Sequence, residues 1–288
     1  MCAIYRRELK SYFCGMTGVI FMAFLLLMTG IYMTVYNFGM GYPAFEYCLS
    51  GISIVYLLAV PVLTMRSVAE EKHSRTDQLL YSLPMSITSV VMAKYLAMVT
   101  VLALPIGVMC LYPLILCMYG SVSLTASYSA ILAFFLLGAA LIAIGMFISS
   151  LTESQVIAAV ISVAVFLLCY LMGGISTLIP ATPGASLAGF LVIAALAGIV
   201  VQLMIRNSLV SLAVTGALGA GFVCVYLRDS SVFANAMPEI LTSLSLFDRM
   251  STFINGMFDM TAVVYYLSVA GLFVFFTVQS LEKKRWNG

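Results

Sequence analysis

Stretches of about 20 almost continuously apolar residues recur along this chain and limit the folds it can adopt. Residues 17–36 (TGVIFMAFLLLMTGIYMTVY) are one example. A helix needs about 20 apolar residues to cross the hydrocarbon core of a bilayer, whereas a barrel strand alternates apolar and polar residues over about ten positions. Only 8% of the residues are charged and 63% are hydrophobic, against about 25% charged in soluble domains. The sequence therefore predicts an all-α, polytopic membrane protein.

The apolar stretches divide into about eight candidate transmembrane helices. They are residues 17–36, 47–65, 90–118, 128–148, 156–179, 187–205, 209–227 and 261–278. Residues 187–227 could instead form a shallow re-entrant hairpin, which would leave six spans. Pro105 and Pro113 predict a kink or break in the third helix, because proline lacks an amide proton. The first apolar run is too long for a secretory signal, so we expect an uncleaved first helix.

The basic residues are distributed unevenly along the chain. If the N-terminus is cytoplasmic, all lysine and arginine residues except Arg228 and Arg249 fall on the cytoplasmic side. The positive-inside rule therefore predicts a multi-pass protein of the cytoplasmic membrane with both termini inside the cell.

Three segments are not expected to cross the bilayer. Residues 3–13 interleave aromatic and charged side chains, which is typical of a helix that lies in the membrane interface. Residues 66–89 form the one long hydrophilic loop on the predicted cytoplasmic side. In residues 228–260, apolar side chains recur at nearly helical spacing, which predicts amphipathic helices on the extracytoplasmic side. All three segments belong to the single transmembrane domain that we predict over residues 1–288.

Motifs of known catalytic sites are absent from the sequence. It contains no phosphate-binding loop of the GxxxxGKS/T type, no HExxH and no GxSxG, and its one histidine, His73, lies in the charged loop. The charged residues Glu46, Glu153 and Lys94 lie near predicted helix ends, where Lys94 can extend to the interface. We therefore expect no enzyme activity, no bound cofactor or metal, and contact with a lipid bilayer rather than with nucleic acid. A transporter that lacks coupling groups of its own should take its energy from a partner protein.

Residues 61–97 carry an ordered pattern of charged, turn and apolar residues, PVLTMRSVAEEKHSRTDQLLYSLPMSITSVVMAKYLA. The pattern resembles the segment between the second and third helices of the gliding-motility branch of ABC type-2 permeases. The matching positions are Pro61, Leu63, Thr64, Met65, Arg66, Glu70, Glu71, Lys72, Thr76, Leu79, Leu80, Pro84 and Lys94. Arg75 stands where that branch usually has glycine. Residues 8–13, 247–259 and 263–267 are similar to the same branch.

The resemblance implies the fold and the partners of an ABC type-2 exporter. It implies a membrane-spanning permease that pairs with a second permease subunit or with a copy of itself. Two copies of an ABC ATPase subunit would lie below this pair and would alone use ATP. An extracytoplasmic auxiliary subunit is a further candidate partner.

The resemblance also implies a role for the loop of residues 66–89. In that family the cytoplasmic loop forms a coupling helix that docks into a groove of the ATPase subunit. Leu79, Leu80 and Tyr81 would then be apolar anchors of docking. Charged residues would form a rim that sets the register, namely Glu70, Glu71, Lys72 and Arg75. Thr76 and Pro84 complete the matching positions of the loop.

Two alternatives stay open on the sequence. A permease-like fold coupled to an ATPase could act as a non-transporting scaffold or mechanotransmitter that moves an extracytoplasmic partner through residues 228–260. An independent channel or secondary carrier would instead transport in liposomes without an ATPase or nucleotide.

Overall fold

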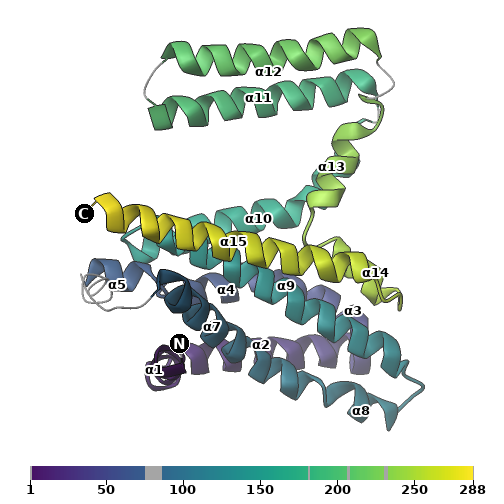
Figure 1. Cartoon of the computed structure of the whole chain (residues 1–288). Helices are drawn as coiled ribbons and strands as arrows, with labels where there is room; N and C mark the ends of the chain where they lie inside the picture. The colour runs from purple at the N-terminus through teal and green to yellow at the C-terminus, as the bar shows by residue number, and fades with distance from the viewer. Residues whose placement is uncertain (1, 75–85, 181, 206–207, 230–232, 288) are drawn as a thin grey trace. The chain divides into compact units, whose positions relative to one another are not determined.

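The computed structural model describes residues 2–74, 86–180, 182–205, 208–229 and 233–287, and the regular structure within these residues is helical (Figure 1). The first half contains α1 (Cys2–Cys14), α2 (Thr17–Met33), a π-helical segment (Thr34–Gly39), α3 (Phe45–Ile52), a 3-10 turn (Ser53–Val55), α4 (Tyr56–Thr64), α5 (Ala69–His73), α7 (Ile87–Met109) and α8 (Tyr112–Cys117). The second half contains α9 (Leu124–Leu151), α10 (Gln155–Leu178), α11 (Pro183–Ile205), α12 (Ser208–Arg228), α13 (Ala236–Leu244), α14 (Arg249–Ile254) and α15 (Met260–Asn287). The prediction of an all-α fold is confirmed.

Within the described residues, 6 helical segments are long and apolar enough to cross a membrane. They are Thr17–Gly39, Phe45–Lys72, Ile87–Cys117, Leu124–Leu151, Gln155–Leu178 and Met260–Lys283. These segments correspond to the predicted spans outside residues 187–227, and they confirm the prediction of a multi-pass membrane protein. The remaining pair also forms helices, α11 of 23 residues and α12 of 21 residues.

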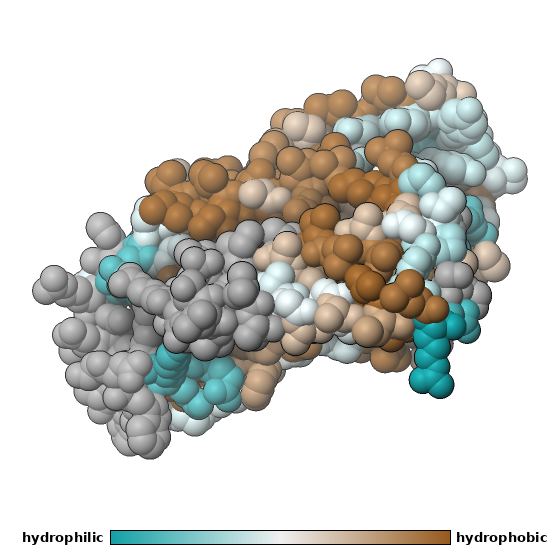
Figure 2. All heavy atoms as spheres, turned by 90° about the horizontal axis from the view of Figure 1, so that it is seen from above, coloured by the Kyte–Doolittle hydropathy of each residue, from teal (hydrophilic) through white to brown (hydrophobic). Residues whose placement is uncertain are grey.

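Large apolar side chains are exposed along the spanning segments, as expected where lipid rather than water is the solvent. In α10, for example, Val156, Ile157 and Val160 are exposed. Figure 2 shows hydrophobic residues gathered over large parts of the face in view. This exposed apolar surface belongs against the hydrocarbon core of the bilayer.

The chain packs into two compact units, and the division between them falls within α10. Unit 1 comprises residues 1–168 and 246–288, and unit 2 comprises residues 169–245. In unit 2, α11 and α12 run side by side and α13 contacts α11. The backbone amide of Met237 in α13 donates a hydrogen bond to Ser186 Oγ in α11 (3.3 Å). The single transmembrane domain over residues 1–288 stays a prediction.

Unit 1 is organised around α9, which contacts α3, α4, α7, α14 and α15. Most residues of α9 are buried, and α4 approaches it at two glycines. A side chain at Gly138 would meet the ring of Tyr56, and a side chain at Gly145 would meet Thr64. Small residues allow helices in a membrane to approach closely. The glycines of α9 therefore leave room for close packing of α4, which leads directly into the loop.

The third span is broken near Pro113, one of the two prolines at which the sequence predicts a kink or break. α7 ends at Met109, and Pro113 lies in the first turn of α8. A proline ring clashes with the carbonyl group four residues earlier, which here belongs to Met109, so the helix does not continue. Pro105 lies inside α7, which continues past it.

The segments that were not expected to span also contain helices. α1 covers residues 3–13, and α13 and α14 lie within residues 228–260. The loop of residues 66–89 begins with the short helix α5, which follows α4 after a turn. The side of the membrane on which each segment lies stays a prediction.

Candidate functional site

The candidate site is the base of the loop, where side chains link α5 to α1, α7 and α9. Of the site residues predicted from sequence, Glu70, Glu71 and Lys72 lie on α5. The others lie outside the described residues, namely Arg75, Thr76, Leu79, Leu80, Tyr81 and Pro84. The docking role of the whole set stays a prediction.

A serine of α9 holds the turn between α4 and α5. Ser149 Oγ accepts hydrogen bonds from the backbone amides of Val68 (3.3 Å) and Ala69 (3.1 Å). The same hydroxyl donates a hydrogen bond to the carbonyl oxygen of Met65 (3.2 Å). The first amides of a helix have no partner within the helix, so Ser149 acts for α5 as an N-cap side chain would. The loop therefore starts from a fixed point on α9.

Lys72 joins the next turn of the loop to the same helix. Its side chain is buried, and its ammonium group donates a hydrogen bond to the carbonyl oxygen of Ser150. Ser150 lies in the last turn of α9. The final carbonyl groups of a helix lack partners within the helix, and its dipole favours a positive charge at this end. Lys72 therefore contacts the chain's own α9 and stabilises the end of that helix.

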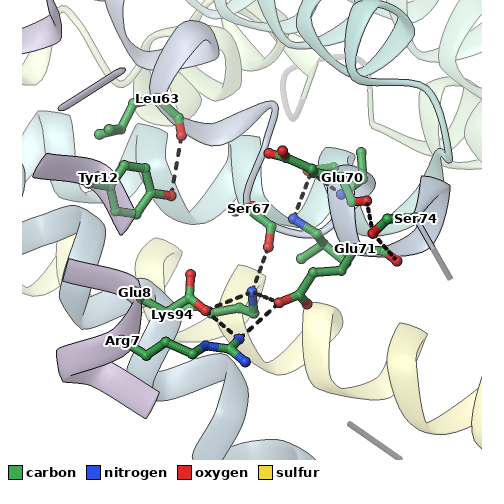
Figure 3. Close-up of polar contacts among 12 residues, drawn as sticks. Arg7, Glu8, Tyr12, Leu63, Ser67, Glu70, Glu71, Ser74 and Lys94 are labelled. Carbon is green, nitrogen blue, oxygen red and sulfur yellow. Dashed lines mark hydrogen bonds and ion pairs between the residues drawn. The ribbon is translucent and has the colours of Figure 1, made fainter. Parts of the chain in front are cut away.

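Four charged side chains from three helices form a closed ring beside α5, which we call the charge ring (Figure 3). They are Arg7 and Glu8 of α1, Glu71 of α5 and Lys94 of α7. Lys94 Nζ lies 2.7 Å from Glu71 Oε1 and 3.5 Å from Glu8 Oε1. Arg7 Nη2 lies 2.8 Å from Glu8 Oε1 and 3.2 Å from Glu71 Oε1. Positive and negative groups therefore alternate around the ring, and their formal charges cancel.

The charge ring is enclosed at Lys94 and open to solvent at Arg7. The side chain of Lys94 is 5% exposed, and that of Arg7 is 60% exposed. Lys94 also donates a hydrogen bond to the carbonyl oxygen of Ser67 (2.8 Å). The side chain of Lys94 thus extends toward the end of its span, as expected. Its ammonium group is surrounded by oxygen atoms of the chain rather than by solvent. The hydrogen bond with Glu8 raises the pKa of Arg7 above its usual value.

Further contacts attach α1 to the bundle. Ile4 packs against α7, and the hydroxyl groups of Tyr5 and Thr100 form a hydrogen bond (2.9 Å). The Tyr12 hydroxyl donates a hydrogen bond to the carbonyl oxygen of Leu63 in α4 (3.5 Å). Burial raises the pKa of Tyr12 above its usual value, so the phenol keeps the proton that it donates. α1 is therefore fixed to both α7 and α4.

Glu70 differs from its neighbour Glu71, because it lies at the surface. Glu70 Oε2 is 3.7 Å from Arg66 Nε, and the two side chains are 50% and 40% exposed. Exposed ion pairs of this kind contribute less than about 1 kcal/mol to stability. Among the predicted residues that the structure describes, Glu70 is thus the most exposed.

Sequence reasoning does not identify Arg7 and Glu8 as residues of this site. One signal could have pointed to a partner for Lys94, which lies near the start of an apolar helix. A charge in such a helix is costly unless an opposite charge accompanies it, so Lys94 predicts a nearby carboxylate. The sequence does not say which carboxylate, because Glu8 and Glu71 are both distant from Lys94 along the chain.

A buried carboxylate lies at the other end of the second span, away from the charge ring. Glu46 is in the first turn of α3, is buried, and accepts a hydrogen bond from Ser127 Oγ (2.9 Å). A negative charge in the first turn is favoured by the helix dipole. Across the described ranges, no group of three or more His, Cys, Asp or Glu side chains could hold a metal ion.

Comparison with known families gives a match over most of the chain. The model of a family described as ABC-2 family transporter protein matches residues 33–281. The matched range includes the loop, Glu71 and Lys94, whereas α1 with Arg7 and Glu8 precedes it. Searches of curated proteins and of solved structures found no match. The gliding-motility branch stays a prediction.

Proposed function

Because this chain belongs to the ABC-2 family of transporter proteins, we propose that it is the permease of an ATP-driven exporter and that its cytoplasmic loop docks on a separate ATPase subunit. Membership of the family makes the chain a permease subunit of an ABC transporter, and such permeases generally work with an ABC ATPase subunit. In this proposal two ATPase copies bind a pair of permeases. One permease is this chain, and the other is a different permease subunit or a second copy of this chain. The ATPase alone binds ATP.

The observation that carries the proposal is the way in which the base of the loop is built. α5 is linked to α9 through Ser149 and Lys72, and to α1 and α7 through the charge ring. These links attach the start of the loop to three helices. Such links are what a loop that receives force from a partner requires, because they give movement a continuous path from the loop into the spans. Leu79 and Leu80 follow this base and would supply the apolar contact with the ATPase.

Purified alone, the chain is expected to hydrolyse no nucleotide, because its sequence has no phosphate-binding loop. Addition of the cognate ATPase subunit should give a stable complex that hydrolyses ATP. The measurement is phosphate release by the chain, by the ATPase subunit and by the complex in lipid nanodiscs. Hydrolysis by the chain that survives removal of every copurifying ATPase would contradict the proposal, as would failure of the two subunits to form a complex.

The proposed topology places the loop inside the cell and residues 228–260 outside. Two exposed positions test it, Ser74 at the end of α5 and Met257 after α14. In a chain whose seven native cysteines are replaced by alanine, Met257→Cys should react with a membrane-impermeant maleimide in intact cells. Ser74→Cys should react only after the cells are permeabilised. Reaction of Ser74→Cys in intact cells would show that the orientation is reversed.

A further inference from the structure

We propose that the charge ring transmits the movement of the loop to α1 and α7, with Lys94 as the positioning residue. This inference rests on the proposed function, since it concerns what happens after an ATPase docks. It assigns a role to Arg7, Glu8 and Lys94, and it makes α1 a moving part of the coupling apparatus rather than a passive interfacial helix.

The surroundings of Lys94 are the first support. An ammonium group has three protons to donate, and three oxygen atoms lie around that of Lys94. They belong to Glu71 in α5, to Ser67 in the preceding turn and to Glu8 in α1. Displacement of any one of these segments from α7 would remove an oxygen from a buried charge, which is costly. Small movements of α5 should therefore carry α1 and α7 with them.

The second support is that stability alone does not account for a ring with one buried charge, that of Lys94. Apolar residues of similar volume often stabilise a buried site as well as ion pairs do, because ion pairs must first lose their water. What the ring adds is a shared contact point, because Glu71 of α5 meets both Arg7 of α1 and Lys94 of α7. The ring therefore defines the position of the loop relative to α1 and α7.

Because positive and negative charges alternate around the ring, exchanging two of its residues should have a different effect from exchanging the members of an isolated ion pair. Exchange of Glu71 and Lys94 would restore an isolated pair. In the ring it would place a carboxylate beside Glu8 and an ammonium group beside Arg7, so the exchange should not restore function. Glu71→Gln combined with Lys94→Met instead leaves the neighbours Arg7 and Glu8 to neutralise each other. This double variant should regain stability while the link between the helices stays broken.

The test follows nucleotide-dependent distances in the complex of the chain with its ATPase. One spin label is placed on the loop at Ser74, a second on α1 at Ser11, and each is paired with a reference label at Met118 near the end of α8; all three positions are exposed. In the wild-type background both distances should change when nucleotide is trapped. In Lys94→Met and in the double variant, the loop distance should still change and the α1 distance should not.

Controls separate positioning from simple stability. Lys94→Arg keeps the charge and should retain both distance changes, and Lys10→Met, an exposed position on α1, should also retain both. The charge exchange of Glu71 and Lys94 should lose the α1 change. An α1 distance that changes in the double variant as it does in the wild type would overturn the proposal, and so would restoration of that change by the charge exchange.

The isolated chain distinguishes failure of this inference from failure of the proposed function. If no ATPase binds the wild-type chain, the proposed function fails, and hydrogen exchange still tests the ring. Lys94→Met should raise the exchange of amides in α1 and α5 together, by a factor on the order of ten, which is within the usual range of coupling between sites. Faster exchange in α5 alone would overturn the inference.

Discussion

Replacing Leu79 and Leu80 together with aspartate is expected to abolish assembly of the chain with its ATPase subunit. Burial of a leucine contributes about 1.5–3 kcal/mol, and a buried carboxylate without a partner adds a desolvation cost. Since about 1.4 kcal/mol corresponds to a tenfold change in affinity, loss of two anchors should weaken the complex by about 10²–10⁴-fold or more. Co-purification from detergent, followed by titration of the ATPase subunit onto the chain in nanodiscs, measures the effect.

The matched control for this prediction is Glu70→Ala, which changes an exposed residue of the same loop. An exposed pair contributes less than about 1 kcal/mol, so this variant should weaken assembly by less than about tenfold. Lys72 is unsuitable as a control, because it is buried against the end of α9. Normal assembly of the double aspartate variant, together with loss of assembly in Glu70→Ala, would place the docking surface elsewhere on the loop.

Replacing Lys94 with methionine is expected to destabilise the folded chain by about 1–3 kcal/mol, the usual cost of leaving largely buried acceptors without their donor. The change leaves Glu8 and Glu71 with Arg7 as their remaining partner in the ring, and Arg7 is mostly exposed. The carbonyl oxygen of Ser67 also loses its donor. Unfolding of the purified chain by SDS in mixed micelles gives the free energy directly.

Two comparisons show whether this effect belongs to the charge ring. Lys10→Met removes a lysine from the exposed face of α1 and should change stability by less than about 1 kcal/mol. Adding Glu71→Gln to Lys94→Met should recover part of the loss, with an interaction free energy of about 0.5–3 kcal/mol. Strictly additive losses would mean that Glu71 and Lys94 are not coupled and that the ring is not an energetic unit.

Features that depend on one short stretch of sequence are predictable for this chain. The spans follow from continuous apolar stretches, and the break after Met109 follows from the single residue Pro113. Helices at residues 3–13 and within residues 228–260 follow from the spacing of their apolar side chains. In each case the physical cause acts over a few turns of helix, so neighbouring residues are sufficient to specify it.

The candidate site could be only partly predicted, because its contacts join distant segments. Glu71 meets Lys94 and Arg7 only after α1, α5 and α7 have packed, and nothing near Glu71 in the sequence distinguishes it from exposed Glu70. The same holds for α5 itself. It is a helix of 5 residues whose first amides depend on Ser149, a residue from the far end of α9.

Helix contacts at small residues could not be predicted from the sequence either. Ala217 and Gly221 of α12 have the spacing of a helix-packing motif, yet both are exposed. Gly138 and Gly145 of α9 are the glycines that α4 approaches. A small residue permits close contact without specifying it. Which glycines form a helix contact depends on which helix packs against them, and that depends on the packing of the whole bundle.

The discontinuity of unit 1 has a consequence for the order in which the protein can mature on the ribosome. Synthesis proceeds from the N-terminus, so α9 is made before α15, with all of unit 2 between them. Until α15 arrives, the ring of Phe147 lacks its later neighbours Phe273 and Phe276, and Tyr266 cannot reach the carbonyl oxygen of Leu246. During the synthesis of unit 2, the nascent unit 1 therefore lacks the contacts between α9 and α15. A translational stall within that interval would leave unit 1 without α15, with the face of α9 that packs against α15 uncovered.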